Sequence, residues 1–149
     1  MSAETTQDYV RANDESRARL RALVGSLDRG QLTRRAMEGW TVSAVLAHLG
    51  FWDRFTVRRW HTRLAGIDVP ALAVLDDLIN ESALPMWNAV PPEAAAREAL
   101  AAAEDADAFV AALGRDVTAR WLAEGRPRSL YRSEHRSEHL DDIERALAR

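Results

Sequence analysis

The spacing of apolar residues constrains the fold of this chain more than any other feature of its sequence. Apolar side chains recur with the helical period, and glycine and proline divide the pattern into segments of ordinary helix length. No segment shows the apolar and polar alternation that predicts a strand. A helix with one apolar face can bury that face only against other elements, so the sequence predicts an all-α protein built by packing helix on helix.

Five helices are expected, and local signals mark several of their ends. Thr41 has the residue type of an N-cap, Gly66 closes the same segment, and Pro85 breaks or restarts the segment in which it lies. Residues 114–128 show no clear pattern. The expected helices cover about 6–27, 42–65, 72–90, 92–113 and 129–147. They predict one four-helix bundle domain over residues 1–149 with an additional short helix, and the third segment can serve as the crossover.

Composition excludes several classes of function. The chain has 149 residues and a net charge of -3, and all 20 of its basic residues are arginines, so no net attraction for phosphate backbones or anionic lipids is expected. We therefore expect neither a nucleic-acid partner nor a membrane partner. The sequence has no export signal and no apolar stretch of membrane-spanning length, which predicts a cytoplasmic protein. Because cysteine is absent, any thiol used in a reaction must come from another molecule.

The stretch "RSEHRSEHL", residues 132–140, repeats a four-residue unit and places two histidines one helical turn apart. In a helix, the row of His135 and His139 continues to Ile143 and Leu147, so both imidazoles extend an apolar stripe. A buried pair of hydrogen-bonded histidines would show the same pattern as two metal ligands. The repeat alone therefore leaves both interpretations open.

Two other histidines could complete a metal site, and helical geometry separates them. His48 lies on the apolar side of its predicted helix, whereas His61 lies about 220° around and about 20 Å along the same helix. We expect His61 near the surface and His48 in the interior. A lone histidine on an apolar face is more often a core residue than a ligand. Together with His135 and His139, however, His48 would give three imidazoles from two helices and leave coordination positions open for substrate.

A second metal motif overlaps the repeat. The stretch "HRSEH", residues 135–139, matches the H-x-x-E-H helix of inverted zinc peptidases, in which the glutamate is the general base. Those enzymes take a third ligand from a glutamate well downstream. Only ten residues follow His139, and Glu144 points away from the histidine row, so the sequence disfavours a peptidase.

Three stretches of the sequence together resemble the DinB/YfiT-like superfamily, and within it the N-terminal domain of mycothiol-dependent maleylpyruvate isomerases. The resemblance covers nearly the whole chain, and the stretches that carry it are "GWTVSAVLAHLGFWDRF", Asn80 in "LDDLINES", and "YRSEHRSEHLDDIERAL". The resemblance implies a DinB-like four-helix bundle in which one histidine of the second helix and two of the last helix hold a divalent metal, zinc or nickel. In this sequence the matching residues are His48, His135 and His139.

The resemblance also implies a reaction class. Members of the family include S-transferases and isomerases that use a low-molecular-weight thiol such as mycothiol on a small-molecule substrate, and homodimers are frequent. For this chain, Glu138 and Asp142 are candidates for orienting the ligand histidines or moving protons, and Trp52 and Asn80 are candidates for lining the pocket. Two other classes remain open: a metal-free bundle that binds or sequesters a small molecule, and a helical interaction module.

Overall fold

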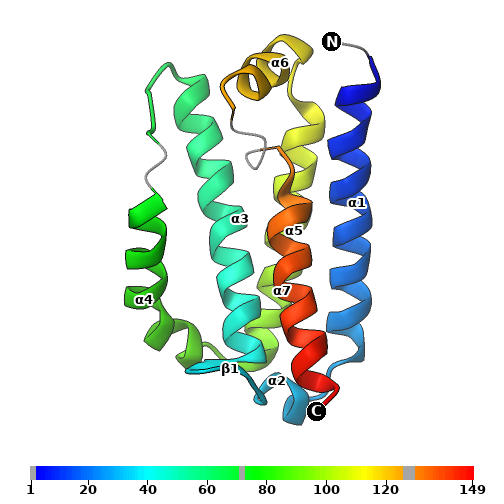
Figure 1. Cartoon of the computed structure of the whole chain (residues 1–149), viewed down its shortest axis with the longest axis vertical. Helices are drawn as coiled ribbons and strands as arrows, with labels where there is room; N and C mark the ends of the chain where they lie inside the picture. The colour runs from blue at the N-terminus through cyan, green and yellow to red at the C-terminus, as the bar shows by residue number, and fades with distance from the viewer. Residues whose placement is uncertain (1–2, 71–72, 126–129) are drawn as a thin grey trace.

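The segments with a helical period form helices. The computed structural model describes residues 3–70, 73–125 and 130–149, and it describes side chains from Asp8 onward. Four long helices form the bundle in Figure 1: α1 (Ala3–Ser26), α3 (Val42–Leu64), α5 (Pro92–Ala112) and α7 (Arg132–Leu147). Three others, α2 (Arg29–Leu32), α4 (Ala73–Ala89) and α6 (Arg115–Ala123), lie at its ends or side. The predicted all-α bundle is confirmed.

The third expected helix, α4, is the crossover of the bundle. Figure 1 shows α3 and α5 running in the same direction, with α4 returning the chain along the outside of α3. In the described residues α4 packs mainly on α3 and on a short strand near the start of α3. Its first six residues are all exposed. A cavity can therefore form between α4 and the bundle.

Local sequence signals set both ends of α3. The Thr41 side chain accepts a hydrogen bond of 3.1 Å from the backbone N–H of Ala44, as an N-cap does. At the other end Gly66 has a φ of 82°, which favours glycine, and its N–H donates to the carbonyl of Arg63. Both predicted ends are confirmed. They position the helix that carries His48.

A short hairpin precedes α3, and the sequence did not predict it. Strands β1 (Arg35–Met37) and β2 (Trp40–Thr41) pair antiparallel, with Gly39 at a φ of 77° in the turn between them. Strands of three and two residues are too short for apolar alternation to be recognisable. The hairpin closes one end of the bundle (Figure 1), and Trp40 packs against the main apolar core.

Two predictions about the helices need correction, and two of the expected helix starts fall on residues outside the described ones. Helix α4 continues through Pro85 instead of breaking there. Pro85 lacks the N–H that would have bonded the carbonyl of Glu81, and both residues are exposed. The last helix begins at Arg132, after the expected start. The expected starts at Leu72 and Ser129 lie outside the described residues.

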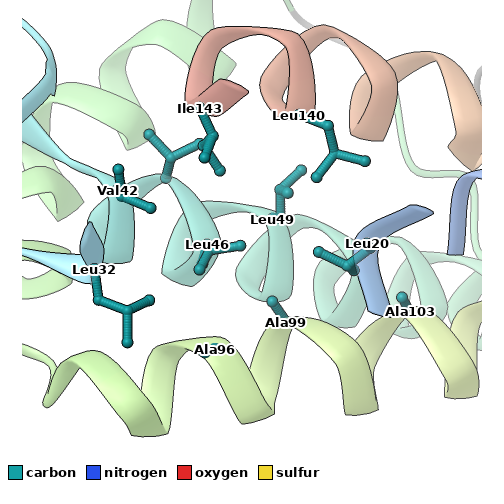
Figure 2. Close-up of a cluster of buried hydrophobic side chains, with 11 residues drawn as sticks. Leu20, Leu32, Val42, Leu46, Leu49, Ala96, Ala99, Ala103, Leu140 and Ile143 are labelled. Atoms are coloured by element: carbon teal, nitrogen blue, oxygen red, sulfur yellow. The ribbon is translucent and has the colours of Figure 1, made fainter. Parts of the chain in front are cut away.

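The main apolar core lies where α1, α3 and α7 meet α5. Figure 2 shows leucine, valine and isoleucine side chains of α1, α3 and α7 above the alanines of α5. The alanine side chains allow a close approach: a Cβ added to Gly50 of α3 would lie 3.4 Å from the backbone of Ala99. Each fully buried leucine contributes about 1.5–3 kcal/mol. This packing sets the positions of α3 and α7, the two helices that carry the histidines, relative to α5 and α1.

Two buried polar residues of α1 attach it to α7. Asn13 and Ser16 interrupt the apolar stripe of α1 in the sequence, yet both are buried. The Asn13 side chain donates to the carbonyl of Leu130 at 2.8 Å and accepts from the N–H of Ser133 at 2.9 Å. These bonds satisfy backbone groups at the start of α7.

Within the described residues, no helix is both long and apolar enough to cross a membrane.

Candidate metal centre

Three histidines from two helices converge at one point. Nε2 of His48 lies 3.1 Å from Nε2 of His135 and 3.1 Å from Nε2 of His139. One ligand atom from each of the three residues lies within 4.8 Å of the others. The structure thus brings together the three residues that the sequence singled out, although they are separated by most of the length of the chain.

The local structure explains this convergence. His135 and His139 stand one turn apart on α7, so their side chains point the same way. His48 belongs to the buried face of α3, is 3 % exposed, and packs its ring edge against two indoles. The ring centroids of His48 and Trp40 are 5.3 Å apart, and those of His48 and Trp87 are 5.0 Å apart. The aromatic rings hold the imidazole in one orientation.

Burial favours the neutral form of the His48 and His139 imidazoles, because it lowers the pKa of each. Loss of water lowers the pKa of His48 to about 3, and repulsion from Arg132, and from His139 when it is protonated, acts in the same direction. Burial also lowers the pKa of His139, against the opposing effect of the Asp142 carboxylate. Neutral imidazole is the form that binds a metal. Both groups therefore have a nitrogen lone pair available at neutral pH.

Hydrogen bonds alone do not account for the three converging nitrogens. A neutral imidazole nitrogen has either one proton or one lone pair in the ring plane, so Nε2 of His48 cannot satisfy both of its close neighbours. A cation between the three atoms would use a lone pair from each. Zinc–nitrogen bonds of about 2.0–2.1 Å in tetrahedral geometry separate the nitrogens by about 3.3 Å, close to the 3.1 Å seen here. The donor set and its spacing fit a divalent metal, and metal binding itself stays a prediction.

Neighbouring charges contact the far side of two rings. Oδ2 of Asp142 lies 3.4 Å from Nδ1 of His139, which is long for a hydrogen bond, so the carboxylate acts mainly through its charge. Nη2 of Arg132 lies 3.4 Å from Nδ1 of His135. Nδ1 of His48 is buried and has no hydrogen-bond partner among the described residues. Asp142 thus stands where the sequence suggested, beside a candidate ligand.

A cavity of about 470 Å³ opens beside the histidines, between α3, α4 and α7. This volume is typical of small-molecule sites. Both residues predicted for the pocket, Trp52 and Asn80, line it, and the indole N–H of Trp52 donates to the Asn80 side chain at 2.9 Å. Glu138 lines it as well, whereas Asp142 does not. The full lining is Trp40, His48, Trp52, Phe55, Thr56, Arg59, Asp76, Asp77, Asn80, Arg132, His135, Glu138 and His139.

His61 lies apart from this site, as expected. It is exposed near the end of α3, and its ring packs against Phe109 with a centroid distance of 4.7 Å. It therefore offers a control histidine on the same helix as His48.

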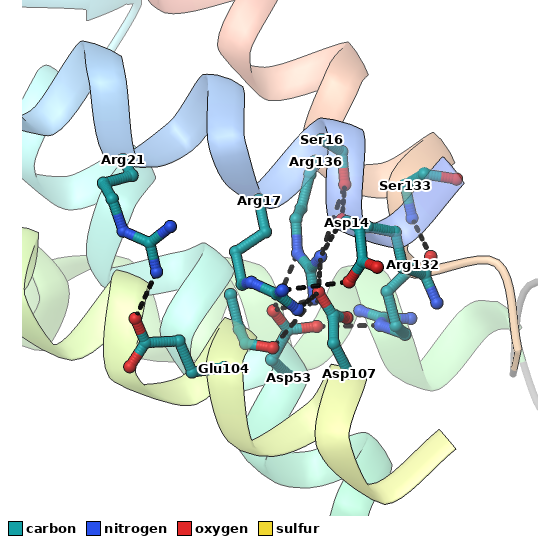
Figure 3. A network of polar contacts seen from close by, with 12 residues as sticks. Asp14, Ser16, Arg17, Arg21, Asp53, Glu104, Asp107, Arg132, Ser133 and Arg136 are labelled. Atoms are coloured by element: carbon teal, nitrogen blue, oxygen red, sulfur yellow. Dashed lines mark hydrogen bonds and ion pairs between the residues drawn. The ribbon is translucent and has the colours of Figure 1, made fainter. Parts of the chain in front are cut away.

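A buried ionic network lies directly behind the histidines, and the sequence did not reveal it. Arg136 is fully buried and donates to both carboxylate oxygens of Asp107, at 2.7 and 2.8 Å, and to Oδ2 of Asp53. Nε of Arg132 donates to Oδ1 of Asp53 at 2.8 Å. Figure 3 shows these side chains, together with Arg17, meeting between the helices. The network ties α7 to α3 and α5 beside His135.

The same repeat that carries the histidines also carries these arginines. Arg132 and Arg136 are four residues apart and form the row that leads to Leu140, which is fully buried. The histidines lie at the edge of that row and are only partly buried. Assigning the apolar stripe of α7 to the histidine row alone was therefore incomplete. The spacing of the arginines was a usable signal, but arginine is usually assumed to face water.

Comparison with known proteins gives one match. The family model described as the mycothiol maleylpyruvate isomerase N-terminal domain matches residues 14–137. The matched range includes His48 and His135 and ends two residues before His139, which the sequence repeat predicted and the structure places with the other two. Neither the search of curated proteins nor that of solved structures found a match.

Proposed function

The chain belongs to the mycothiol maleylpyruvate isomerase N-terminal domain family, whose model matches residues 14–137, and from this premise we propose that it is a divalent-metal-dependent enzyme that uses a low-molecular-weight thiol. The reaction would be an S-transfer or an isomerisation of a small-molecule substrate, with mycothiol as the first thiol to test. The observation that carries this proposal is the convergence of three imidazoles on one wall of a cavity of small-molecule size.

His48, His135 and His139 are the residues that would hold the ion, with zinc or nickel as the proposed metal. Such an ion, when bound, polarises a substrate or lowers the pKa of a bound thiol or water. The chain has no cysteine, so the sulfur must belong to a second small molecule. A cytoplasmic location, where low-molecular-weight thiols are kept reduced, belongs to the same proposal.

The carboxylates have separate proposed roles. Glu138 lines the cavity beside the histidines and is exposed, so it could take up the proton that a thiol releases before attack. Asp142 lies behind His139 and would hold that ring in place as a positioning residue. Trp52 and Asn80 would shape the cavity, because their hydrogen bond joins its α3 and α4 walls.

Thiol consumption should depend on metal. Protein purified without a nickel column is assayed for metal content and then for conjugation of mycothiol and other low-molecular-weight thiols to a panel of electrophiles. We expect turnover that chelator abolishes and added zinc or nickel restores. Glu138→Gln should lower the rate at least about 100-fold without changing the metal content, because it removes a proton acceptor.

Glu134 provides the control for that variant. It lies one turn earlier on α7 and does not line the cavity, so Glu134→Gln should keep the wild-type rate. A metal-loaded protein with no turnover for any thiol would contradict the proposed enzyme. A protein that binds small molecules in the cavity but contains no metal would instead support the metal-free binding protein as the alternative.

We also propose a homodimer, as the family resemblance implies. The exposed face of α4 supports this proposal, because Val74, Leu78 and Met86 are 74 %, 57 % and 73 % exposed. Apolar residues gathered on one helix commonly mark an interface. Light scattering at micromolar concentration should give twice the mass of the chain, and Leu78→Glu should reduce it to that of one chain. A monomeric wild type would contradict the proposal.

A further inference from the structure

We propose that Arg132 opposes metal binding by His135, so that this histidine becomes the third ligand only when the guanidinium shifts away from its ring. Arg132 is thereby assigned as a positioning residue that lowers the affinity of the candidate metal centre. The inference rests on the proposed function in so far as the three histidines hold the metal. It adds to that function a group that controls one of the ligands.

The two histidines of α7 have opposite charges behind their rings. A histidine that binds a metal through one ring nitrogen has a proton on the other, and that N–H usually donates to a carboxylate, a carbonyl or water. His139 follows this rule, because Oδ2 of Asp142 lies 3.4 Å from its Nδ1. His135 does not, because Nη2 of Arg132 lies 3.4 Å from its Nδ1. A guanidinium has only donors and is always protonated, so it favours a lone pair on that Nδ1.

This contact sets the proton positions of the cluster without metal. With a lone pair on Nδ1, His135 has its ring proton on Nε2, which lies 3.1 Å from Nε2 of His48 and can donate to it. Neutral His48 then has its own proton on Nδ1, which is buried without a hydrogen-bond partner among the described residues. The charge of Asp142 favours the proton of His139 on Nδ1. His48 and His139 thus direct Nε2 lone pairs toward the centre, whereas His135 directs an N–H toward it.

Arg132 is held beside His135 by a residue of α3. Its Nε donates to Oδ1 of Asp53 at 2.8 Å, and its side chain is only 8 % exposed. Asp53 is itself held, because its Oδ2 accepts from the fully buried Arg136. Figure 3 shows Arg132, Asp53 and Arg136 in this network. Moving the guanidinium away from His135 therefore disturbs a buried ion pair, which has an energetic cost.

Coordination through Nε2 of His135 requires the other tautomer of its ring. The proton on Nε2 is lost and one is gained on Nδ1, so the charge of the imidazole does not change. The new N–H faces an N–H of Arg132 across the 3.4 Å contact, and the two groups repel each other. Either the ring or the guanidinium must shift before His135 can bind. The cost of that shift lowers the metal affinity below the value that three unopposed imidazoles would give.

NMR of protein with isotope-labelled histidine reports these proton positions directly. The ring nitrogens give separate signals, and the signals of His135 are identified by their absence in His135→Ala. In chelator-treated wild type we expect the proton of His135 on Nε2, and after addition of zinc we expect it on Nδ1. In chelator-treated Arg132→Leu a larger share of molecules should have it on Nδ1, because the donor that favours a lone pair there is gone.

Zinc affinity measures the cost of the contact. In competition with a chelator of known affinity, Arg132→Leu should bind zinc at least about tenfold more tightly than the wild type, as the loss of one opposing contact to a charged group allows. Arg132→Lys keeps the charge, and its shorter side chain can still pair with Asp53, so it should also bind more tightly than the wild type. Arg58→Leu is the matched control, because Arg58 is exposed and does not line the cavity, and it should keep the wild-type affinity.

Circular dichroism checks that each variant is folded. If Arg132→Leu does not fold, the proton position in the wild type and the affinity of Arg132→Lys decide the question. Three results would overturn the proposal: the proton of His135 on Nδ1 in the chelator-treated wild type, a folded Arg132→Leu that binds zinc no more tightly than the wild type, or an Arg132→Lys that matches the wild type. The last result would assign the effect to charge alone.

Failure of the proposed function gives a different result. If neither the wild type nor Arg132→Leu binds zinc, the metal centre itself is contradicted, and the effect of Arg132 on affinity is rejected with it. If the two proteins bind zinc equally well, the metal centre stands and only the role of Arg132 is rejected.

Discussion

Alanine at any one of His48, His135 and His139 should weaken zinc or nickel binding by orders of magnitude, and thiol-dependent turnover should fall with it. Each substitution removes one of three protein ligands whose Nε2 atoms meet at a single point. Because Nε2 of His48 lies 3.1 Å from both of the other two, its loss also removes the central member of the cluster. Metal content after dialysis, and competition with a chelator of known affinity, measure the effect.

His61→Ala is the control for these variants, because His61 is exposed and distant on the same helix. Its metal affinity should equal that of the wild type. Thermal unfolding gives a second readout, since a metal that binds only the folded state adds about 2.7 kcal/mol at a free concentration about 100 times its Kd. Chelator should lower the Tm of the wild type and of His61→Ala, and hardly change that of His48→Ala. Full metal occupancy in His48→Ala would exclude the three-histidine site.

The largest effect on stability is expected from the buried ionic network. Asp107→Asn removes a carboxylate that is 3 % exposed and leaves the fully buried Arg136 with less compensation. Breaking a buried ion pair from one side commonly costs about 3–5 kcal/mol, because the remaining charge stays desolvated. We expect a loss of that order in the free energy of unfolding, measured by urea denaturation followed by circular dichroism.

Asp105 is a matched control two residues away on α5. Its carboxylate pairs with Arg54 at the surface and is 63 % exposed, so Asp105→Asn should cost less than about 1 kcal/mol. The contrast tests whether the network behind the histidines stabilises the fold by its burial. A similar loss of unfolding free energy in Asp107→Asn and Asp105→Asn would show that burial does not determine how strongly an ion pair stabilises this fold.

Much of the fold could be predicted because it depends on local rules. Thr41 caps α3 and Gly66 ends it through contacts within a few residues, which the sequence displays directly. The spacing of His135 and His139 likewise follows from the helical period alone. The hairpin around Gly39 and the continuation of α4 through Pro85 were missed, because short strands and exposed prolines leave weak signals.

The candidate site divides in the same way. The sequence by itself determined that three histidines lie on inward faces of two helices, because facing depends only on position within a helix. The tertiary structure decided that they meet, since His48 is 87 and 91 positions from its partners and only packing can bring them within 3.1 Å. Packing also turned Arg132 and Arg136 inward onto Asp53 and Asp107. A charged side chain is buried only where a distant carboxylate compensates it, and that pairing cannot be read from residues near it in the chain.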